Sequence, residues 1–452
     1  MNPLAQYAEG LEGLARSRGL DYYPVDFELA PQSLMTEIAV YGLPVRMPHW
    51  SFGVRYIHQL VRQSMGHSKI FEVMFPGDPC RAFLMDSNSL AENALVTAHV
   101  LGHADFAKNN QLFARFHEMS GGNIVDQAAA HAHRIQNAIN QAGLERVEAV
   151  LDAALALESH VDVSGELHRA RYPEFVSEKR KIQKTGFQKR FGALPGESEP
   201  QEVPIGPLRA AIPPHPEHDL LWFIAQYAPD LEQWERDIFL MVRAESLYFY
   251  PVFACQIMNE GWASYWHARL LREADFLPQE LYLQTLKAHS DVVRPFAAGE
   301  ETALAVNPYH LGFAVWERIV EKHGLERARE VRRDEDDFGF IRNWLDRELA
   351  EQAGLLVYEA SADGEIRVAS RSLAAVREAI LAPKFNYGAP RVAVVGLAAD
   401  GSLELAHEHA ADGRGLDAAR AREVLGYVRR VWRRTVRLQT ADERGEKIEL
   451  AA

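Results

Sequence analysis

Long proline-free stretches, in which apolar residues recur every three or four positions, constrain most of this chain to a helical fold. Leu90 to Glu118 is such a stretch and ends before Gly121-Gly122, and Asp126 to Leu157 has the pattern of one amphipathic helix or a helix pair. Asn307-Pro308 predicts a further helix start, because asparagine caps helices and proline suits the first turn. The first 350 residues are therefore expected to be mainly helical.

A proline-rich segment, residues 192–218, interrupts this helical pattern. Its seven prolines exclude a regular helix and predict an extended loop: Pro195, Pro200, Pro204, Pro207, Pro213, Pro214 and Pro216. Helix is expected to resume at His218 or Asp219 and to continue, with interruptions, to about Glu273. Pro251 should kink or divide that helix.

Short strand-like runs replace the long helical pattern near residue 353. Two predicted hairpins contain Asp-Gly, a strong signal for tight turns. The predicted order is ββαββαββ, with strands at 355–359, 365–370, 391–397, 402–406, 435–439 and 447–450 and helices at 372–381 and 417–431. We therefore expect an α+β protein with a large helical domain at residues 1–350 and a small α+β domain at residues 351–452.

The charge balance restricts the partners of the chain. The net charge is −14, which disfavours nucleic-acid binding because phosphate backbones are repelled. Two basic runs, Lys179 to Lys184 and Arg429 to Arg437, are either solvated faces or docking patches for an acidic partner. Only two cysteines, Cys80 and Cys255, are present, which suits a reducing compartment.

Neither end of the chain nor its interior has a membrane-spanning pattern. The first 20 residues lack the uninterrupted apolar run of a signal peptide, and no segment approaches the roughly 20 apolar residues of a membrane span. We therefore expect a cytoplasmic protein with no membrane span.

The first candidate site is His99-Val100-Leu101-Gly102-His103. Histidines four residues apart lie on one face of a helix, so both imidazoles can bind one metal ion. The alternative is a pair of hydrogen-bonded core histidines. Gly102 costs helix stability, which indicates that another element packs closely there.

The second candidate is Asn259-Glu260, which follows an apolar run. A buried carboxylate needs a cation, a metal or a proton. Asn259-Glu260-x-x-Ala263 resembles the helix that supplies the third zinc ligand in HExxH metallopeptidases, and zinc with two histidines, a glutamate and an open position is a hydrolytic arrangement. Those enzymes place a general-base glutamate directly after the first histidine, where this chain has Val100, so a simple HExxH mechanism is excluded.

Three further residues are candidates for proton transfer. His310 falls in the first turn of the helix expected after Asn307-Pro308, where the helix dipole favours the neutral, metal-binding imidazole; it could instead only cap or pack there. Glu92 and His267 each lie seven residues from a proposed ligand, His99 and Glu260, on the same helix face. Such Glu/His pairs also allow a two-metal oxidative site, although its Glu-x-x-His signature is absent.

At these residues the chain resembles the SpoVR (stage V sporulation protein R) family. The resemblance runs over nearly the whole chain and is carried by the segments 98–106, 108–110, 219–224, 234–238, 256–267 and 307–313. It implies a bacterial or archaeal protein associated with spore cortex formation or stress responses. It also implies protein partners in a system with a PrkA-like kinase and a von Willebrand-type protein.

Two functions are consistent with these observations. The first is a metal-dependent hydrolase, in which His99, His103 and Glu260 hold zinc or a similar divalent ion and Glu92, His267 or His310 handles protons. Its substrate would be an amide bond in peptidoglycan or its precursors. The second is a noncatalytic regulatory or scaffold protein that acts with the kinase system and docks through the small C-terminal domain.

Overall fold

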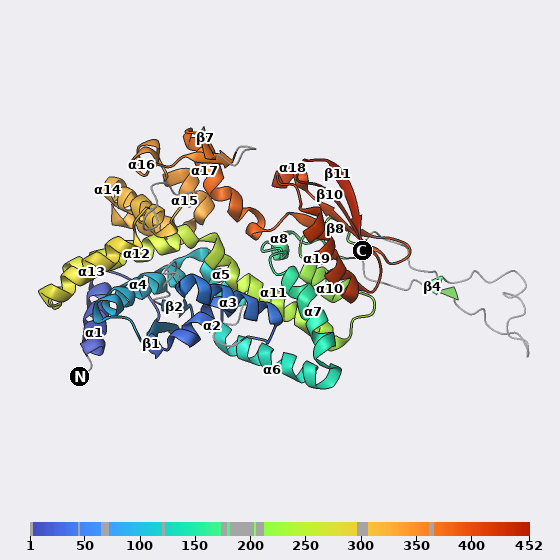
Figure 1. Ribbon diagram of the computed structural model, residues 1–452, viewed down its shortest axis with the longest axis horizontal. Coiled ribbons are helices and arrows are strands. Elements are labelled where there is room, and N and C mark those ends of the chain that lie inside the picture. Colours follow the sequence, from blue (N-terminus) through green and yellow to red (C-terminus); the bar gives the residue numbers. More distant parts are fainter. Residues whose placement is uncertain are drawn as a thin grey trace, which may run out of the picture. The chain divides into compact units, whose positions relative to one another are not determined.

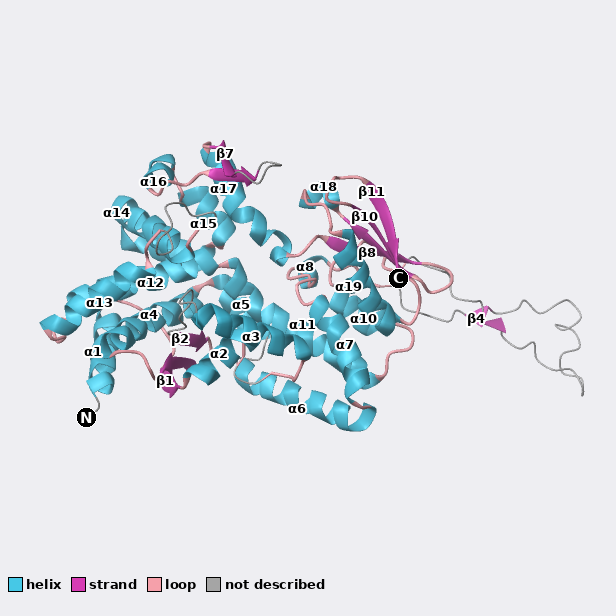
Figure 2. Ribbon diagram, in the orientation of Figure 1, coloured by secondary structure: helices cyan, strands magenta, loops and turns pink. Residues whose placement is uncertain are grey.

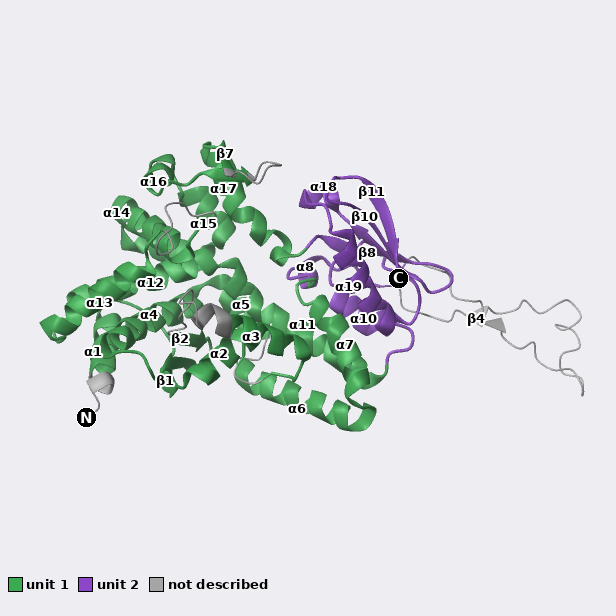
Figure 3. Cartoon of the chain, viewed as in Figure 1, with its two compact units in different colours: residues 1–161, 232–389 green, residues 162–231, 390–452 purple. Residues whose placement is uncertain are grey.

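The computed structural model describes residues 3–43, 46–64, 72–119, 123–172, 179–180, 203–204, 212–295, 306–360 and 366–452 (Figures 1 and 2). The chain divides into two compact units (Figure 3). Unit 1 comprises residues 1–161 and 232–389, and unit 2 comprises residues 162–231 and 390–452. Helices predominate, and short strands form separate small sheets, so the expected α+β class is confirmed.

Unit 1 is mainly helical. Its described helices are α1 (Pro3–Ser17), α2 (Gln32–Tyr41), α3 (Trp50–Ser64), α4 (Leu90–Asn109), α5 (Gln111–Met119), α6 (Ile124–Ala142), α7 (Leu144–Ala156), α11 (Gln233–Ala254), α12 (Gln256–Glu273), α13 (Gln279–Val292), α14 (Pro308–Asp334), α15 (Asp337–Trp344), α16 (Arg347–Gln352), α17 (Leu373–Leu381) and the 3-10 segment η1 (Ala382–Gly388). Its described strands are β1 (Val25–Ala30), β2 (Glu72–Phe75), β3 (Cys80–Met85), β6 (Val357–Ala360) and β7 (Ile366–Ser370).

Three helices, α4, α12 and α14, pack together in the core of unit 1. Glycines allow the close approach of α12 to both of its neighbours. A Cβ at Gly312 of α14 would lie 2.1 Å from the carbonyl oxygen of Ile257, and a Cβ at Gly102 of α4 would lie 2.7 Å from Cα of Ala263. The close packing expected at Gly102 is confirmed, and its partner is α12.

A three-stranded sheet lies beside these helices and was not predicted from the sequence. Its order is β1-β3-β2, with β1 parallel and β2 antiparallel to β3. β3 is buried at five of its six residues. Glu72 is the first residue of β2.

The helical stretch expected from Leu90 to Glu118 is divided into two helices, α4 and α5. The break is at Asn110, whose side chain accepts hydrogen bonds from the backbone of Leu112 and Phe113 and donates to the carbonyl oxygens of Arg332 and Glu335. The asparagine thus starts α5 and also binds the end of α14. These tertiary partners favour a break that neither proline nor glycine signals.

Other helix boundaries agree with the sequence. Asn307 caps α14 by accepting a hydrogen bond from the backbone N–H of Tyr309, as expected. Gly143, at φ +88°, separates α6 from α7, so the pattern from Asp126 to Leu157 is a helix pair. Pro251 lies near the end of α11, which meets α12 at a bend of 59°.

Unit 2 contains a four-stranded sheet of order β11-β10-β9-β8, in which β9 and β10 are parallel and the other pairs antiparallel. Its described elements are α8 (Gly165–His168), β4 (Lys179–Arg180), β5 (Val203–Pro204), α10 (Leu220–Tyr227), β8 (Val392–Leu397), β9 (Leu403–His407), α18 (His409–Asp412), α19 (Ala418–Trp432), β10 (Val436–Ala441) and β11 (Lys447–Ala451). Gly401 has a φ of +82° in the turn between β8 and β9, as Asp-Gly predicts.

The C-terminal elements follow the predicted ββαββαββ order, but they do not form one sheet. β6 and β7 pair only with each other and belong to unit 1, so the expected boundary at residue 350 falls inside that unit. The first Asp-Gly turn, at residues 362–364, and most of the proline-rich segment 192–218 lie outside the described residues. Residues 212–231 belong to unit 2, where Glu217 forms a bridge with Val394 of β8.

Among the described helices, none is by itself long and apolar enough to cross a bilayer. The bent pair of α11 and α12 passes the same test of length and composition only when the two helices are taken together.

Candidate metal centre

α4 presents His99 and His103 one turn apart. The helix begins with a capping box, in which Ser89 and Glu92 exchange hydrogen bonds between side chains and backbone. Both imidazoles are buried, with 2% and 8% of each residue exposed, and their ring centroids are 4.5 Å apart. The spacing seen in the sequence therefore does place both rings in one small region of the core.

α12 brings Glu260 to this histidine pair. Oε2 of Glu260 lies 3.5 Å from Nε2 of His99 and 3.5 Å from Nε2 of His103. The helices can approach this closely because Gly102 of α4 faces Ala263 of α12, one turn after the glutamate. The three residues predicted as ligands are thus brought together.

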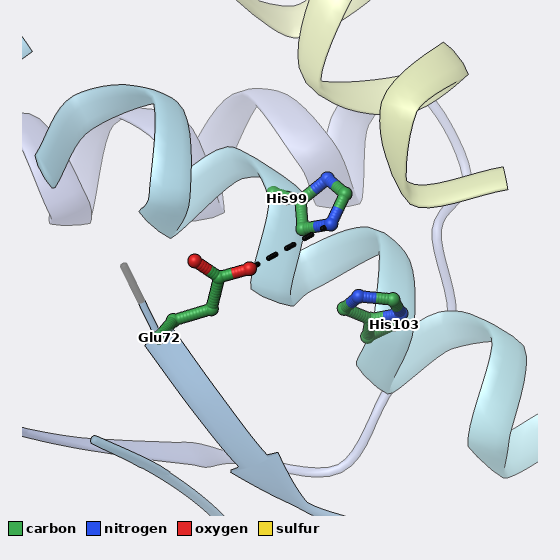
Figure 4. A group of neighbouring side chains, drawn as sticks. All are labelled: Glu72, His99 and His103. Carbon is green, nitrogen blue, oxygen red and sulfur yellow. Dashed lines mark ion pairs between the residues drawn. The ribbon is translucent and has the colours of Figure 1, made fainter. Parts of the chain in front are cut away.

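Glu72 is a fourth member of the cluster and was not predicted. It reaches from β2 toward the two imidazoles of α4 (Figure 4), and its Oε1 lies 3.8 Å from Nε2 of His99. One ligand atom from each of Glu72, His99 and His103 lies within 4.8 Å of the others. No metal-ligand spacing in the sequence marks this residue, because it is brought to the site by strand pairing with β3.

A hydrogen bond fixes which nitrogen of His103 faces the glutamate. Nδ1 of His103 lies 2.9 Å from Oδ1 of Asn259. An amide oxygen only accepts, so Nδ1 carries a proton and donates it. In the neutral imidazole, Nε2 therefore has a free lone pair directed at Glu260.

His99 is held in a comparable way by a chain of two further histidines. Its Nδ1 lies 2.9 Å from Nδ1 of His267, and Nε2 of His267 lies 2.7 Å from Nδ1 of His289. In one arrangement of the protons, Nδ1 of His99 donates to His267 and Nε2 of His267 donates to His289. Nε2 of His99 then carries no proton and is free to accept a hydrogen bond or bind a metal ion. His267 thus contacts the outer nitrogen of His99, and His289 was not predicted.

Two inner atoms of the cluster, one on His99 and one on Glu260, lack hydrogen-bond partners. Nε2 of His99 and Oε2 of Glu260 are both buried and make no hydrogen bond within the described structure. Acceptor atoms that converge in a buried space require a proton or a cation between them. Two ligands of a tetrahedral zinc ion lie about 3.4 Å apart for bonds of about 2.1 Å, close to the two 3.5 Å separations.

The charges in the cluster shift the pKa values of its members. Burial alone would raise the pKa of Glu260, but His103 and His99 outweigh burial and hold that pKa well below its usual range. Burial would lower the pKa of His103, but Glu260 outweighs it, and the pKa is raised. Without a metal, a proton shared with His103 therefore takes the place of the cation.

The pKa of Glu72 and that of Tyr309 shift the other way from that of Glu260. Burial raises the pKa of Glu72, against the opposing effect of the two histidines. The charge of Glu260, followed by burial, raises the pKa of Tyr309 well above its ordinary value. Tyr309 therefore keeps its proton, and its ring stacks on that of His99 with centroids 6.0 Å apart.

Two of the predicted proton-transfer residues make other contacts. The carboxylate of Glu92 accepts a hydrogen bond from the backbone N–H of Ser89, at the start of α4 and about 10 Å along the helix from His99. Nδ1 of His310 donates to the carbonyl oxygen of Val293 at 2.9 Å. Its neighbour Tyr309, rather than His310, is the residue of this helix turn that stacks on His99.

Comparison with known proteins identifies the family. Residues 1–387 match the family described as SpoVR like protein, and residues 390–443 match the SpoVR-like C-terminal domain. The chain belongs to the SpoVR family. The residues of the metal centre all lie within the first match, and the sheet and α19 of unit 2 lie largely within the second.

One relative in this family is the uncharacterized protein YcgB of Escherichia coli (strain K12), which is 31% identical to this chain. The similarity covers 69% of this chain and 62% of that protein, so the chain spans less than two thirds of its relative. No solved structure matches this SpoVR family member.

Proposed function

We propose that this protein is a metal-dependent hydrolase that holds a divalent ion, zinc, between His99, His103 and Glu260. The convergence of two imidazole Nε2 atoms on one carboxylate oxygen, 3.5 Å from each, supports the proposal most strongly. His103 is oriented by Asn259 and His99 by His267, as is typical of metal-binding histidines. Zinc in such a site would lower the pKa of bound water and polarise a carbonyl group.

Glu72 offers the carboxylate that the sequence lacks beside His99. Val100 occupies the position of the general base in HExxH enzymes, but β2 brings Glu72 to within 3.8 Å of His99 from another direction. Its pKa is raised by burial, which makes the carboxylate a stronger proton acceptor than an exposed glutamate. We assign Glu72 as the general base and His267 as the residue that orients His99.

The substrate class that we propose is an amide bond, in peptidoglycan or its precursors. This choice rests on the spore-cortex association implied by the family resemblance and on the use of zinc sites of this composition in hydrolysis. Tyr309 stacks beside His99, and its protonated hydroxyl donates a hydrogen bond to the carboxylate of Glu260, so it helps to hold that proposed ligand in place.

A second candidate function is a noncatalytic scaffold that acts with a PrkA-like kinase system. The observation that favours it is also the position of Glu72. If Glu72 binds the ion, two histidines and two glutamates complete four ligands, and such closed sites are structural. The two functions therefore differ in what Glu72 does.

The variant Glu72→Gln separates these two functions. We expect the variant to keep stoichiometric zinc, because three ligands remain, and to lose at least 100-fold in the rate of amine release from purified peptidoglycan fragments. Glu280→Gln, an exposed change on α13, is the matched control and should keep the wild-type rate. A loss of zinc affinity in Glu72→Gln, with no amide hydrolysis by zinc-loaded wild type, would favour the scaffold.

A further inference from the structure

A row of arginines on and just after α19 is a strongly charged feature outside the candidate metal centre. Between Ala418 and Arg437 the chain has seven arginines, no lysine and one acidic residue, Glu423, although the whole chain carries a net charge of −14. This local excess of positive charge lies in unit 2 and takes no part in the proposed hydrolysis.

The helix separates its apolar residues from its arginines. Leu425, Val428, Val431 and Trp432 are buried beneath the helix. Arg422, Arg429, Arg430 and Arg433 are exposed, and their spacing of three, four, seven and eight residues places them on one face. We call this set the α19 arginine face.

Gly426 lies at the middle of the α19 arginine face, between Arg422 and Arg429. A Cβ at this position would meet no atom within 4 Å, so packing does not require glycine here. Glycine in a helix interior costs about 1 kcal/mol relative to alanine. Its effect is to leave the backbone open between the arginine side chains.

Several arginines of this region have intramolecular partners, whereas Arg422 and Arg429 have no ion pair within the described structure. Arg434 pairs with Asp230 at 3.0 Å, and Arg433 donates to the carbonyl oxygen of the same residue. Arg422 donates only to a carbonyl oxygen of its own helix, at 3.5 Å, and Arg429 has no ion pair within the described structure. Exposed arginines without an ion pair raise the local positive potential.

We propose that the α19 arginine face binds an acidic segment, rich in aspartate and glutamate, of a partner protein. Guanidinium groups bind carboxylates with two parallel hydrogen bonds, which explains the use of arginine without lysine. Arg422 and Arg433 are separated by about 16 Å along the helix, the length of about five residues of extended peptide.

A peptide suits this surface better than a nucleic acid. Trp432 is buried, and the half-buried ring of Tyr427 is covered by the guanidinium of Arg430, 5.5 Å from its centroid, so the face offers no row of open aromatic rings for base stacking. A long phosphate polymer would also meet the negative charge of the rest of the chain, whereas a short acidic segment can be confined to the helix.

Fluorescence anisotropy with the full chain and a labelled eight-residue glutamate peptide tests the proposal. We expect saturable binding that weakens with added salt and falls at least 10-fold in Arg429→Glu/Arg430→Glu. Arg347→Glu/Arg371→Glu changes the net charge equally at exposed sites of unit 1 and should retain wild-type affinity. Arg429→Lys/Arg430→Lys keeps the charge and should lose part of the affinity, because lysine lacks the fork geometry.

Three results would overturn the proposal. These are no binding of the glutamate peptide by the wild-type chain, an equal loss of affinity in both charge-reversal variants, and tighter binding of a DNA oligonucleotide of the same charge through the same arginines. Unchanged thermal unfolding of the variants, expected because the residues are exposed, shows that any loss is local.

Discussion

At the scale of single residues, the position of the metal centre depends on buried charges that fix the start of α12. Both carboxylate oxygens of Asp337 accept hydrogen bonds from the backbone, those of Ile257 and Met258, each at 2.9 Å. Asp337 also pairs with Lys384 at 3.0 Å, and both side chains are buried. The helix start is therefore held a few residues before Asn259 and Glu260.

Asp337→Asn should be strongly destabilising. The substitution leaves the ammonium group of Lys384 buried beside a neutral amide, which typically costs about 3–5 kcal/mol. The double variant Asp337→Asn/Lys384→Met removes both charges and should lose markedly less stability. Urea unfolding measures the stability of both variants. Equal losses of stability in the single and double variants would show that the unpaired charge of Lys384 does not cause the destabilisation.

His160 gives the free energy of unfolding a dependence on pH. Burial lowers its pKa to about 4 from the ordinary 6.5, so the imidazole is neutral in the folded chain. The neutral imidazole contributes its full share to the free energy of unfolding above pH 6.5. This contribution is lost as the pH falls toward 4, because His160 binds a proton in the unfolded chain before it does so in the folded chain. The shift corresponds to about 3 kcal/mol.

A His160→Leu variant should lose less stability than wild type between pH 6.5 and pH 4. The comparison of urea unfolding at these two pH values measures the difference. Parallel pH dependence of the two proteins would contradict the assignment.

At the scale of elements, the glycines of α4, α12 and α14 set the distance between the helices that carry the ligands. Gly312→Ala would place a methyl group 2.1 Å from the carbonyl oxygen of Ile257, so α12 and α14 must separate. We expect a loss of about 1–3 kcal/mol and weaker zinc binding. Gly13→Ala is the control, because the exposed Gly13 in α1 has nothing within 4 Å of an added Cβ and should gain up to about 1 kcal/mol.

Thermal and urea unfolding of the two alanine variants test this account. Equal stability of Gly312→Ala and Gly13→Ala would show that the close helix packing is not required.

Elements that depend on local signals were predictable from the sequence, and those that depend on distant contacts were not. The Asn307 cap, the turn at Gly401 and the order of the C-terminal elements follow from residues close in sequence. The break at Asn110 depends on the end of α14, more than 200 residues away. In the candidate site, His99 and His103 were predicted from helix spacing, and Glu260 was predicted from the apolar run before it and its resemblance to the third-ligand helix of HExxH enzymes. Glu72 was not predicted, because it depends on the pairing of β2 with β3.

At the scale of the whole molecule, unit 2 is built from two segments that are far apart in the sequence. Residues 212–231 contribute Glu217, which bridges to Val394, and Phe223, which is fully buried and stacks on Trp432. His218 also pairs with Glu408 at 3.0 Å. The C-terminal family match, residues 390–443, therefore covers only part of this folding unit.

Residues 390–452 expressed alone should be poorly folded, because Trp432 loses the cover that Phe223 provides. Fusion of residues 212–231 to this fragment should restore a cooperative thermal transition. Circular dichroism with temperature measures both fragments, and a cooperative transition of equal midpoint in the two would show that the earlier segment is dispensable.

The central claim is that His99 and His103 of α4 and Glu260 of α12 bind one metal ion, with Glu72 of β2 beside it. A calorimetric titration of zinc into chelator-treated protein tests it most directly. We predict one zinc ion per chain in the wild type and in Glu280→Gln, and at least 100-fold weaker binding in His103→Ala and Glu260→Gln. A wild-type chain that stays folded and takes up no zinc, or a His103→Ala variant that binds zinc as tightly as wild type, would contradict the account.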